Sequence, residues 1–193
     1  MRVIKQLLIG SLALMLGASA IAATIDISGV KVEDQNTVAG STLQLNGAGV
    51  RVKFFKIYVA ELYTSTKVHT LEELIAAPGP KRLRLTFLRE VNSSTFGKLM
   101  TRGVEDNVQK NQLSRMVPGL MRMSEIFTVN KSYLPGDVIT LDWIPGTGMV
   151  ITGKGKVQGE PFKEPEFFKG LMAIWFGDSP ADWKLKDAML DTK

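Results

Sequence analysis

Three cations, Arg51, Lys53 and Lys56, stand inside an apolar, β-prone run of this sequence, and their placement there needs a chemical reason. Arg51 follows a glycine-rich stretch at residues 46–49, and glycine lets another backbone approach closely. An arginine in a buried strand needs an anion, which is either a protein carboxylate or a ligand. Lys53 and Lys56 are expected at the strand edge or its solvent face, because their flexible stems carry the ammonium group to water. Arg51 is therefore the candidate for binding a ligand anion.

This sequence has few residues of the types that usually form catalytic triads or metal sites. His69 is the only histidine, and there is no cysteine. A His-rich or thiolate metal site and a Ser-His-Asp triad are therefore not expected. Residues 153–156, Gly-Lys-Gly-Lys, follow a predicted hairpin strand and lack the spacing of a phosphate-binding loop. We expect neither a metal nor a cofactor.

Large apolar side chains could form a pocket beside the arginine. Phe55, Tyr58, Phe96 and Met100 supply aromatic or flexible surface in the predicted elements. Such residues usually build the core. The alternative is that the sheet and the helices leave an apolar pocket into which Arg51 projects.

Alternating apolar residues predict the strands that would position these side chains. The predicted strands are residues 25–32, 42–45, 50–63 and 82–91, with a hairpin made by residues 138–143 and 149–152. A turn is expected at residues 46–49. Within residues 50–63 the apolar face changes phase at Phe54 and Phe55, which predicts a bulge or bend there.

Apolar residues at three- and four-residue spacing predict the helices. They are expected at residues 71–77, from a cap at Ser93 or Ser94, from Pro118, over residues 165–176, and over residues 180–190 with Ser179 as the cap. Strands early and late in the chain, with helices between and after them, are typical of an α+β fold whose antiparallel-rich sheet is packed by helices.

The first residues have the layout of a secretory signal peptide. Arg2 and Lys5 precede an apolar run at residues 7–16, and small residues follow it. The run is too short to span a bilayer. We expect cleavage near Ala22, a single mature domain at residues 23–193, and a periplasmic location without stable membrane insertion.

Charge limits the partners of this domain. The formal net charge of +5 comes from 24 Lys and Arg against 19 Asp and Glu, which are spread over the chain without a cationic block. Nucleic acid is therefore not an expected partner. A small amphipathic or apolar ligand is the partner that the apolar segments favour.

Three groups of motifs occur in one order along the chain. They are GAGVR at residues 47–51 with KIYVAELY at residues 56–63, PGDVITLDWIPG at residues 135–146, and IWFGDSP at residues 174–180. Together they resemble elements of the chalcone isomerase superfamily, in particular its exported bacterial branch. The resemblance implies a large antiparallel sheet covered on one face by helices, with a ligand cleft between them.

The resemblance also implies roles for individual residues. In plant chalcone isomerases an arginine beside the glycine-rich turn stabilises the oxygen anion of the substrate, and Arg51 falls at its position. Tyr58, Phe96, Gly103 and Ile174 fall near the other polar positions, so four of five polar roles are changed. Because each lost donor costs about 3 kcal/mol of transition-state stabilisation, these changes argue against catalysis.

Three hypotheses follow. The favoured one is an exported, non-catalytic protein that binds a fatty acid or similar amphipathic acid, as some members of the superfamily do with an arginine on the carboxylate. Its expected ligand-binding residues are Arg51, Tyr58, Phe55, Phe96, Met100 and Ile174. The second is an isomerase or intramolecular lyase for an enone-type substrate, with Arg51 as electrophile and Tyr58 as acid. The third is a structural or interaction module of the cell envelope whose cleft is filled by its own side chains.

Overall fold

The computed structural model describes residues 23–129 and 131–192. The signal peptide predicted at residues 1–22 lies outside the described residues, so it stays a prediction, as does the periplasmic location. Among the described residues, no helix combines the length and the apolar character needed to cross a membrane.

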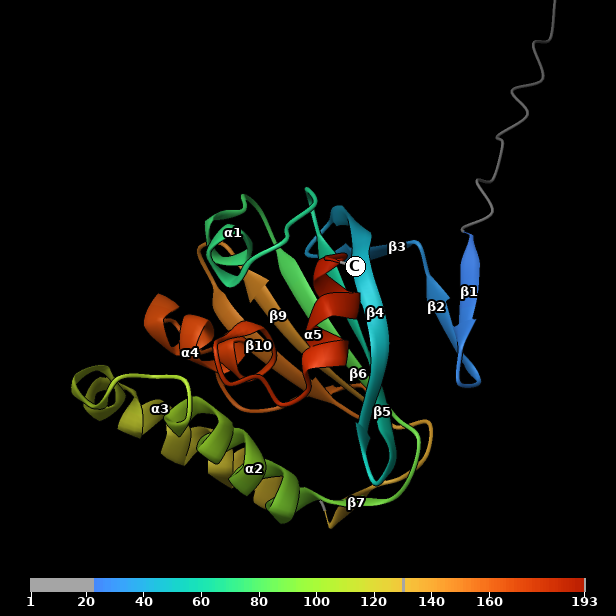
Figure 1. Ribbon diagram of the computed structural model, residues 1–193. Helices are drawn as coiled ribbons and strands as arrows, with labels where there is room; N and C mark the ends of the chain where they lie inside the picture. The colour runs from blue at the N-terminus through green and yellow to red at the C-terminus, as the bar shows by residue number, and fades with distance from the viewer. Residues whose placement is uncertain (1–22, 130, 193) are drawn as a thin grey trace, which may run out of the picture.

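A seven-stranded sheet is the centre of the fold, and each strand in it runs antiparallel to its neighbours (Figure 1). The strand order is β11-β10-β9-β6-β5-β4-β3. The bounds are β3 Gln35–Val38, β4 Ser41–Lys53, β5 Phe55–Thr64, β6 Lys81–Phe87, β9 Val138–Ile144, β10 Gly148–Gly153 and β11 Lys156–Val157. Two shorter pairs lie outside this sheet, and they are β1 Thr24–Ile27 with β2 Val30–Glu33, and β7 Val91–Asn92 with β8 Ser132–Tyr133.

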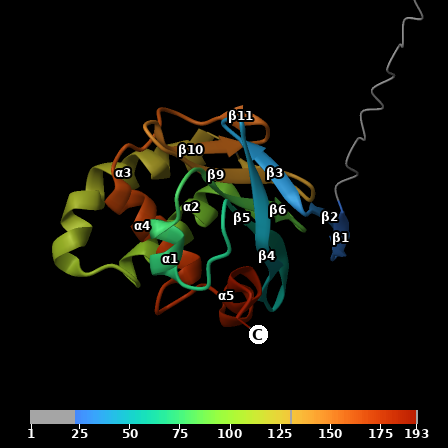
Figure 2. The same cartoon turned by 90° about the horizontal axis from the view of Figure 1, so that it is seen from above.

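The helices lie against one face of the sheet (Figures 1 and 2). Their bounds are α1 Leu71–Ala76, α2 Ser93–Glu105, α3 Lys110–Val129, α4 Pro165–Phe176 and α5 Trp183–Leu190. Helices α2 and α3 pack on each other, α4 contacts both of them, and α5 lies along β4. The sequence prediction of an α+β fold, with a large antiparallel sheet covered on one face by helices, is confirmed.

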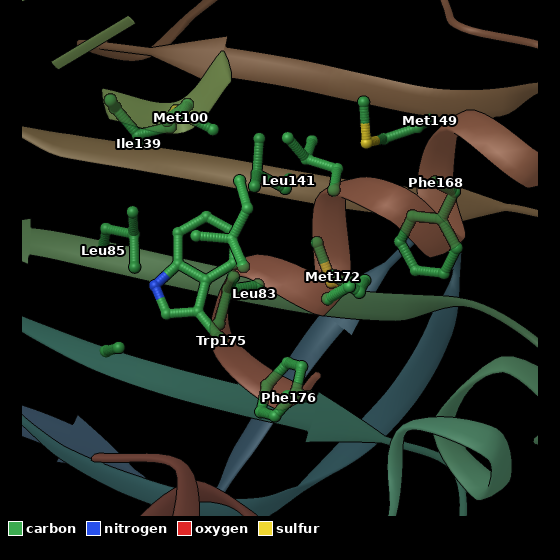
Figure 3. Close-up of a cluster of buried hydrophobic side chains, with 14 of the residues drawn as sticks. Leu83, Leu85, Met100, Ile139, Leu141, Met149, Phe168, Met172, Trp175 and Phe176 are labelled. Atoms are coloured by element: carbon green, nitrogen blue, oxygen red, sulfur yellow. The ribbon is translucent and has the colours of Figure 1, made fainter. Parts of the chain in front are cut away.

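Helix α4 supplies the centre of the hydrophobic core. Its residues from Leu171 to Phe176 are all buried, because the helix faces the sheet and is also contacted by α1, α2, α3 and α5 (Figure 3). Figure 3 shows Trp175 and Met172 of this helix against Leu83 and Leu141 of the sheet. A helix that is apolar on nearly all sides is typical of a position inside a core.

The opposite face of the sheet carries paired charges. The carboxylate of Glu61, fully buried, accepts hydrogen bonds from Arg84 Nη1 at 3.0 Å and from the Tyr63 hydroxyl at 2.7 Å. Arg82 donates two hydrogen bonds to Asp142, at 2.7 and 2.6 Å. Period-2 alternation in β5, β6 and β9 therefore separates an apolar, helix-covered face from a face of ion pairs.

The prediction of one strand over residues 50–63 is wrong. Strand β4 ends at Lys53 and β5 begins at Phe55, so the chain reverses at Phe54, whose φ is 63°. A reversal changes the phase of the apolar pattern just as a bulge does, and no glycine or asparagine at this position signals a turn. The pairing does shift register as well, between Arg51 and Val52.

The turn predicted at residues 46–49 is also wrong, because these residues lie inside β4. The register between β4 and β5 shifts at Asn46. The side-chain amide of Asn46 donates hydrogen bonds to the backbone oxygens of Val68 and Met189 and accepts one from Val68 N. The predicted strands over residues 25–32 and 82–91 are each divided in two. Residues 28 and 29 turn the chain between β1 and β2, and residues 88–90 separate β6 from β7.

Two helix starts differ from the prediction. Asn92 is the cap of α2, with its side chain accepting from Thr95 N, and not Ser93 or Ser94. Pro118 does not begin a helix but lies inside α3. Proline removes one helical hydrogen bond, and a helix of 20 residues can continue past that loss.

Helix α5 begins later than predicted. Its cap is Asp182 rather than Ser179, and its first residue is Trp183. The Asp182 carboxylate accepts from the backbone N–H groups of Lys184 and Leu185. The helices predicted at residues 71–77 and 165–176 and the hairpin at residues 138–152 are confirmed as α1, α4 and β9-β10, within a residue or two at their ends.

Two glycines of β4 determine how closely α5 approaches the sheet. A Cβ atom on Gly47 would collide with the backbone carbonyl of Ala188 and lie 2.7 Å from Met189 O. A Cβ on Gly49 would lie 2.9 Å from the Ala188 side chain. These residues face the helix layer, because their partners across the strand pair, Leu62 and Ala60, belong to the main core. The glycines are therefore a docking surface for α5.

Substitution of Gly47 by alanine should push α5 from the sheet. Because the added methyl group meets backbone atoms, we expect the free energy of unfolding to fall by about 2 kcal/mol. Urea unfolding measures this change. The matched control is Ala48→Ser, one residue along and on the opposite face, which should change stability far less. Equal stabilities of the Gly47→Ala and parent proteins would show that α5 does not pack as described.

Candidate functional site

The pairing of β4 with β5 brings two of the predicted site residues together. Arg51 lies directly opposite Tyr58 in the antiparallel register. Side chains at opposed positions lie on the same face of a sheet. Tyr58 belongs to the main core, so both side chains are on the face that the helices cover.

A protein carboxylate is the partner of Arg51 in this structure. Its Nη1 donates to Asp182 Oδ2 at 3.2 Å and to the backbone oxygen of Val52 at 2.9 Å. The side chains of Arg51 and Asp182 are 19% and 13% exposed, so the ion pair is partly shielded from water. The arginine that follows the two docking glycines thus holds the first turn of α5.

Asp182 joins three functions in one carboxylate. It caps α5, pairs with Arg51, and accepts a hydrogen bond from Val52 N at 3.2 Å. Burial acts to raise the pKa of this carboxyl group, but the N–H groups of Val52 and Leu185 and the Arg51 guanidinium outweigh it, so the pKa lies below its usual value. At neutral pH Asp182 is ionised and the ion pair is complete.

Tyr58 is a buried phenol with a specific partner. Trp175 Nε1 donates to its hydroxyl oxygen at 3.0 Å. Burial raises the pKa of Tyr58 to about 12, against the opposing effects of the Trp175 hydrogen bond and the Arg51 charge. A phenol with such a pKa is neutral at physiological pH. It can donate a hydrogen bond, but it is poorly matched to general acid catalysis, which works best with a pKa near the working pH.

Three of the predicted apolar residues lie in the same core as Tyr58. Phe96 contacts the Tyr58 ring edge-on with the ring centroids 6.4 Å apart, and Met100 and Ile174 are buried in the same cluster. Ile174 also packs closely on Gly103 of α2, where a Cβ would lie 3.0 Å from its Cγ2. These side chains fill the space between the sheet, α2 and α4.

Phe55 is not part of this group. Its side chain is 64% exposed at the end of the β4-β5 hairpin, where the guanidinium of Arg89 lies 4.9 Å from its ring centre. Lys53 and Lys56 are exposed, as the sequence predicts. The hairpin reversal at Phe54 carries Phe55 away from the helix layer and from Arg51.

Two hollows on the helix side lie elsewhere. One, of about 300 Å³, is lined by residues of α3 and the start of α4, including Met116 and Phe167. The other, of about 750 Å³, follows the groove between α2 and α3, beside Leu120 and Met121. Neither of these two hollows is lined by any of the six residues predicted to bind a ligand.

Sequence reasoning missed two members of the site, Asp182 and Trp175. Asp182 could have been found from its position before an apolar helical pattern, since aspartate is a favoured cap, but Ser179 and Pro180 gave an earlier signal of the same kind. Trp175 lies in the apolar second half of α4, where nothing distinguishes a tryptophan with a hydrogen-bonding role from a core residue. Among the described residues, no group of three or more His, Cys, Asp or Glu side chains could hold a metal ion.

The structure is an α+β fold in which a curled antiparallel sheet is covered on one face by helices (Figure 1). Arg51 of the sheet lies at the helix layer. The model of the chalcone isomerase-like family matches residues 23–191, and the chain belongs to this family.

Comparison with solved structures supports the same fold. The crystal structure of a fatty-acid binding protein of Arabidopsis thaliana is similar, with a TM-score of 0.68 and 14% sequence identity over 88% of this chain and 97% of that one. At this identity the likeness shows the fold alone. A search of curated proteins gave no match.

A double-mutant cycle measures the ion pair at the site. Arg51→Gln and Asp182→Asn each remove one charge, and asparagine retains the capping ability of residue 182. We expect a coupling energy of about 1 kcal/mol between the two substitutions at neutral pH, from urea unfolding of the four proteins. A coupling energy near zero would mean that the pair contributes nothing to stability.

Acid should remove this coupling. Because the folded-state pKa of Asp182 is lowered, its contribution to stability is complete above the unfolded-state value, about 3.9, and is lost as the pH falls through the folded-state value. The stability difference between the parent and Asp182→Asn should therefore shrink below about pH 4. A difference that persists there contradicts the assignment.

Proposed function

We propose that this chain is an exported, non-catalytic member of the chalcone isomerase-like family that binds a fatty acid or a similar amphipathic acid. The observation that carries the proposal is the partly buried Arg51, which lies at the edge of the layer between the sheet and the helices, opposite the buried Tyr58. The similarity to a plant fatty-acid binding protein supports it.

The head group would bind at Arg51. Both hydrogen bonds described for its guanidinium come from Nη1, and a guanidinium has five N–H donors in a fork that suits a carboxylate. A ligand carboxylate is chemically equivalent to the Asp182 side chain, so it can share Arg51 or replace Asp182 there. The neutral Tyr58 hydroxyl can donate its hydrogen to the same carboxylate.

The tail would lie in the apolar layer. Phe96 of α2 contacts the Tyr58 ring, and Met100 of α2 and Ile174 of α4 are buried in the same core. None of the three carries a polar group that a hydrocarbon chain would leave unpaired. Methionine side chains adapt to different shapes at low cost. The layer is packed in this structure, so binding requires α5 or α2 to move outward. The Arg51-Asp182 contact is the point where such a movement would start.

A native mass spectrum of freshly purified protein tests both the ligand and the export. After expression of the full chain in a bacterium, we expect a polypeptide that lacks residues 1–22 and carries an added mass of one acyl-chain acid. Arg51→Gln should reduce the occupied fraction about tenfold, because a charged hydrogen bond contributes about 1.5 kcal/mol or more.

The matched control is Arg102→Gln, the same chemical change at an exposed residue of α2. It should leave occupancy unchanged. Lipid-free protein that also has no affinity for added fatty acids would overturn the binding proposal. A full-length N-terminus in the exported fraction would overturn cleavage near Ala22 without affecting the binding proposal.

A second candidate function is a structural or interaction module of the cell envelope. The pairing of Arg51 with Asp182 favours it, because the anion that the arginine requires is supplied by the protein itself. On this hypothesis Arg51→Gln lowers stability and leaves the native mass spectrum unchanged. On the binding hypothesis it lowers both stability and ligand occupancy.

Catalysis on an enone-type substrate is the remaining alternative, and we expect none. Arg51 could act as electrophile, but Tyr58 holds its proton too tightly to be an efficient acid, and Phe96 and Ile174 supply no polar group to order a water. Chalcones and other enones mixed with the protein should therefore cyclise at the uncatalysed rate. Saturable turnover that falls at least about tenfold in Tyr58→Phe would establish an enzyme instead.

A further inference from the structure

The end of the β4-β5 hairpin exposes apolar side chains at adjacent positions. Phe54 is 92% exposed, Phe55 is 64% exposed and Val52 is 49% exposed. In Figure 1 the hairpin forms the lower end of the sheet, away from the centre of the core. Single exposed apolar residues are common on protein surfaces, but two adjacent phenylalanines at a hairpin end need an explanation.

The backbone conformation of Phe54 is also unusual for a phenylalanine. Its φ of 63° lies in the left-handed region, where glycine or asparagine is favoured and a bulky residue is an outlier. Folding would be served better by glycine at this position. The side chain of Phe54 makes almost no contact with the rest of the chain, so its presence is not explained by packing. Strained residues of this kind cluster at functional sites.

Cations surround the exposed rings. Lys53 and Lys56 flank Phe54 and Phe55 along the chain, and both are exposed. Arg89 from the loop after β6 lies over the ring of Phe55, with 4.9 Å between its Cζ and the ring centre. Lys56 donates to the hydroxyl of Ser28 in the β1-β2 turn, which holds its charge near the hairpin.

The carboxylates of the same segments do not cancel these charges. Asp182 is engaged by Arg51, and the exposed Glu90 is next to Arg89 in the loop. Asp26 lies near the β1-β2 turn, where it accepts a hydrogen bond from Gly29 N. Among the described residues, neither Lys53 nor Lys56 forms an ion pair with a carboxylate, so both cations stand beside the two aromatic rings without such a partner.

We propose that this hairpin end docks on the surface of an anionic lipid bilayer. The aromatic rings of Phe54 and Phe55 would enter the interfacial region, while Lys53, Lys56 and Arg89 would lie among the anionic head groups. Apolar burial and electrostatic attraction are the two contributions that bind peripheral proteins to bilayers. The proposal goes beyond the proposed function and does not depend on it. The contacts described for Arg51 are to Asp182 and to the backbone of Val52, and not to Phe54, Phe55 or the three cations.

Vesicle sedimentation tests the docking. The parent protein, purified after expression of the full chain and with its N-terminus determined, is mixed with vesicles of about 30% phosphatidylglycerol in phosphatidylcholine, and with pure phosphatidylcholine vesicles, at roughly 0.1 M salt. We expect binding to the anionic vesicles to be stronger and to weaken at high salt. Phe54→Gly should bind at least about tenfold more weakly, because the ring is no longer buried in lipid.

Two measurements separate docking from a folding defect. Phe54→Gly removes the backbone strain, so its Tm should equal or exceed that of the parent while its vesicle binding falls. If Phe54→Gly fails to fold, Phe54→Asn provides the same comparison, because asparagine tolerates a positive φ. Replacing Lys53 and Lys56 together by glutamine should weaken binding to anionic vesicles about fivefold per lysine and leave binding to phosphatidylcholine unchanged.

The matched control is Met121→Ser on α3, which removes an exposed apolar side chain far along the chain from the hairpin. It should bind as the parent does. The proposal would be overturned if Phe54→Gly bound vesicles as strongly as the parent, or if the parent bound vesicles equally well with and without phosphatidylglycerol. The proposal would also be overturned if the parent were a dimer that does not bind vesicles and the Phe54→Gly variant were a monomer. A second copy of the chain would then be the partner of the hairpin end.

Discussion

The close packing of α5 on two glycines of β4 is the contact on which the candidate site depends. Gly47, Gly49 and Arg51 alternate along one strand and face the same helix. The glycines allow α5 to touch the backbone of the sheet, and the arginine then reaches the cap of that helix at Asp182. The residues Gly47, Gly49 and Arg51 therefore form one structural unit with α5, because the position of the helix and that of the arginine depend on each other.

This unit explains why Arg51 can lie at the edge of an apolar core without an external ligand. Its charge is matched by Asp182, whose remaining hydrogen bonds satisfy N–H groups at the start of α5 and in β4. A ligand anion at Arg51 has to offer interactions comparable to those that Asp182 already provides. The proposed binding would therefore be coupled to the position of α5, since a ligand that replaced Asp182 at Arg51 would also break a contact between that helix and the sheet.

Much of the fold follows from the sequence, and the errors have physical causes. The core helix at residues 165–176 is a long apolar segment between Pro165 and Gly177, and the hairpin at residues 138–152 has a clear turn between its strands, so their prediction succeeded. The irregularity at Phe54 and Phe55 was predicted, but as a bulge or bend and not as a reversal, because a phenylalanine with positive φ gives no turn signal. The stretch at residues 46–49 was misread as a turn, since glycine there provides space for α5 and not freedom of the backbone. The glycines did suggest the close approach of another backbone, but the sequence alone does not show that α5 is the element that approaches.

The candidate site shows the same division. Arg51 and Tyr58 could be paired in advance by chemistry and by the family motif, although the sequence placed them on one strand rather than on two strands that face each other. Phe55 was grouped with them as a large aromatic residue of the same predicted strand. Once the chain reverses, the pattern that suggested a bend inside the core instead places two aromatic rings and two lysines at the outer end of the sheet. The apolar residues between Val50 and Tyr63 therefore lie in two different environments, the core and the exposed end of the hairpin. Tyr58 and its neighbours in β5 are fixed by the core, whereas Phe54 and Phe55 contribute nothing to the core, and the reason for their presence must be sought outside the folded chain.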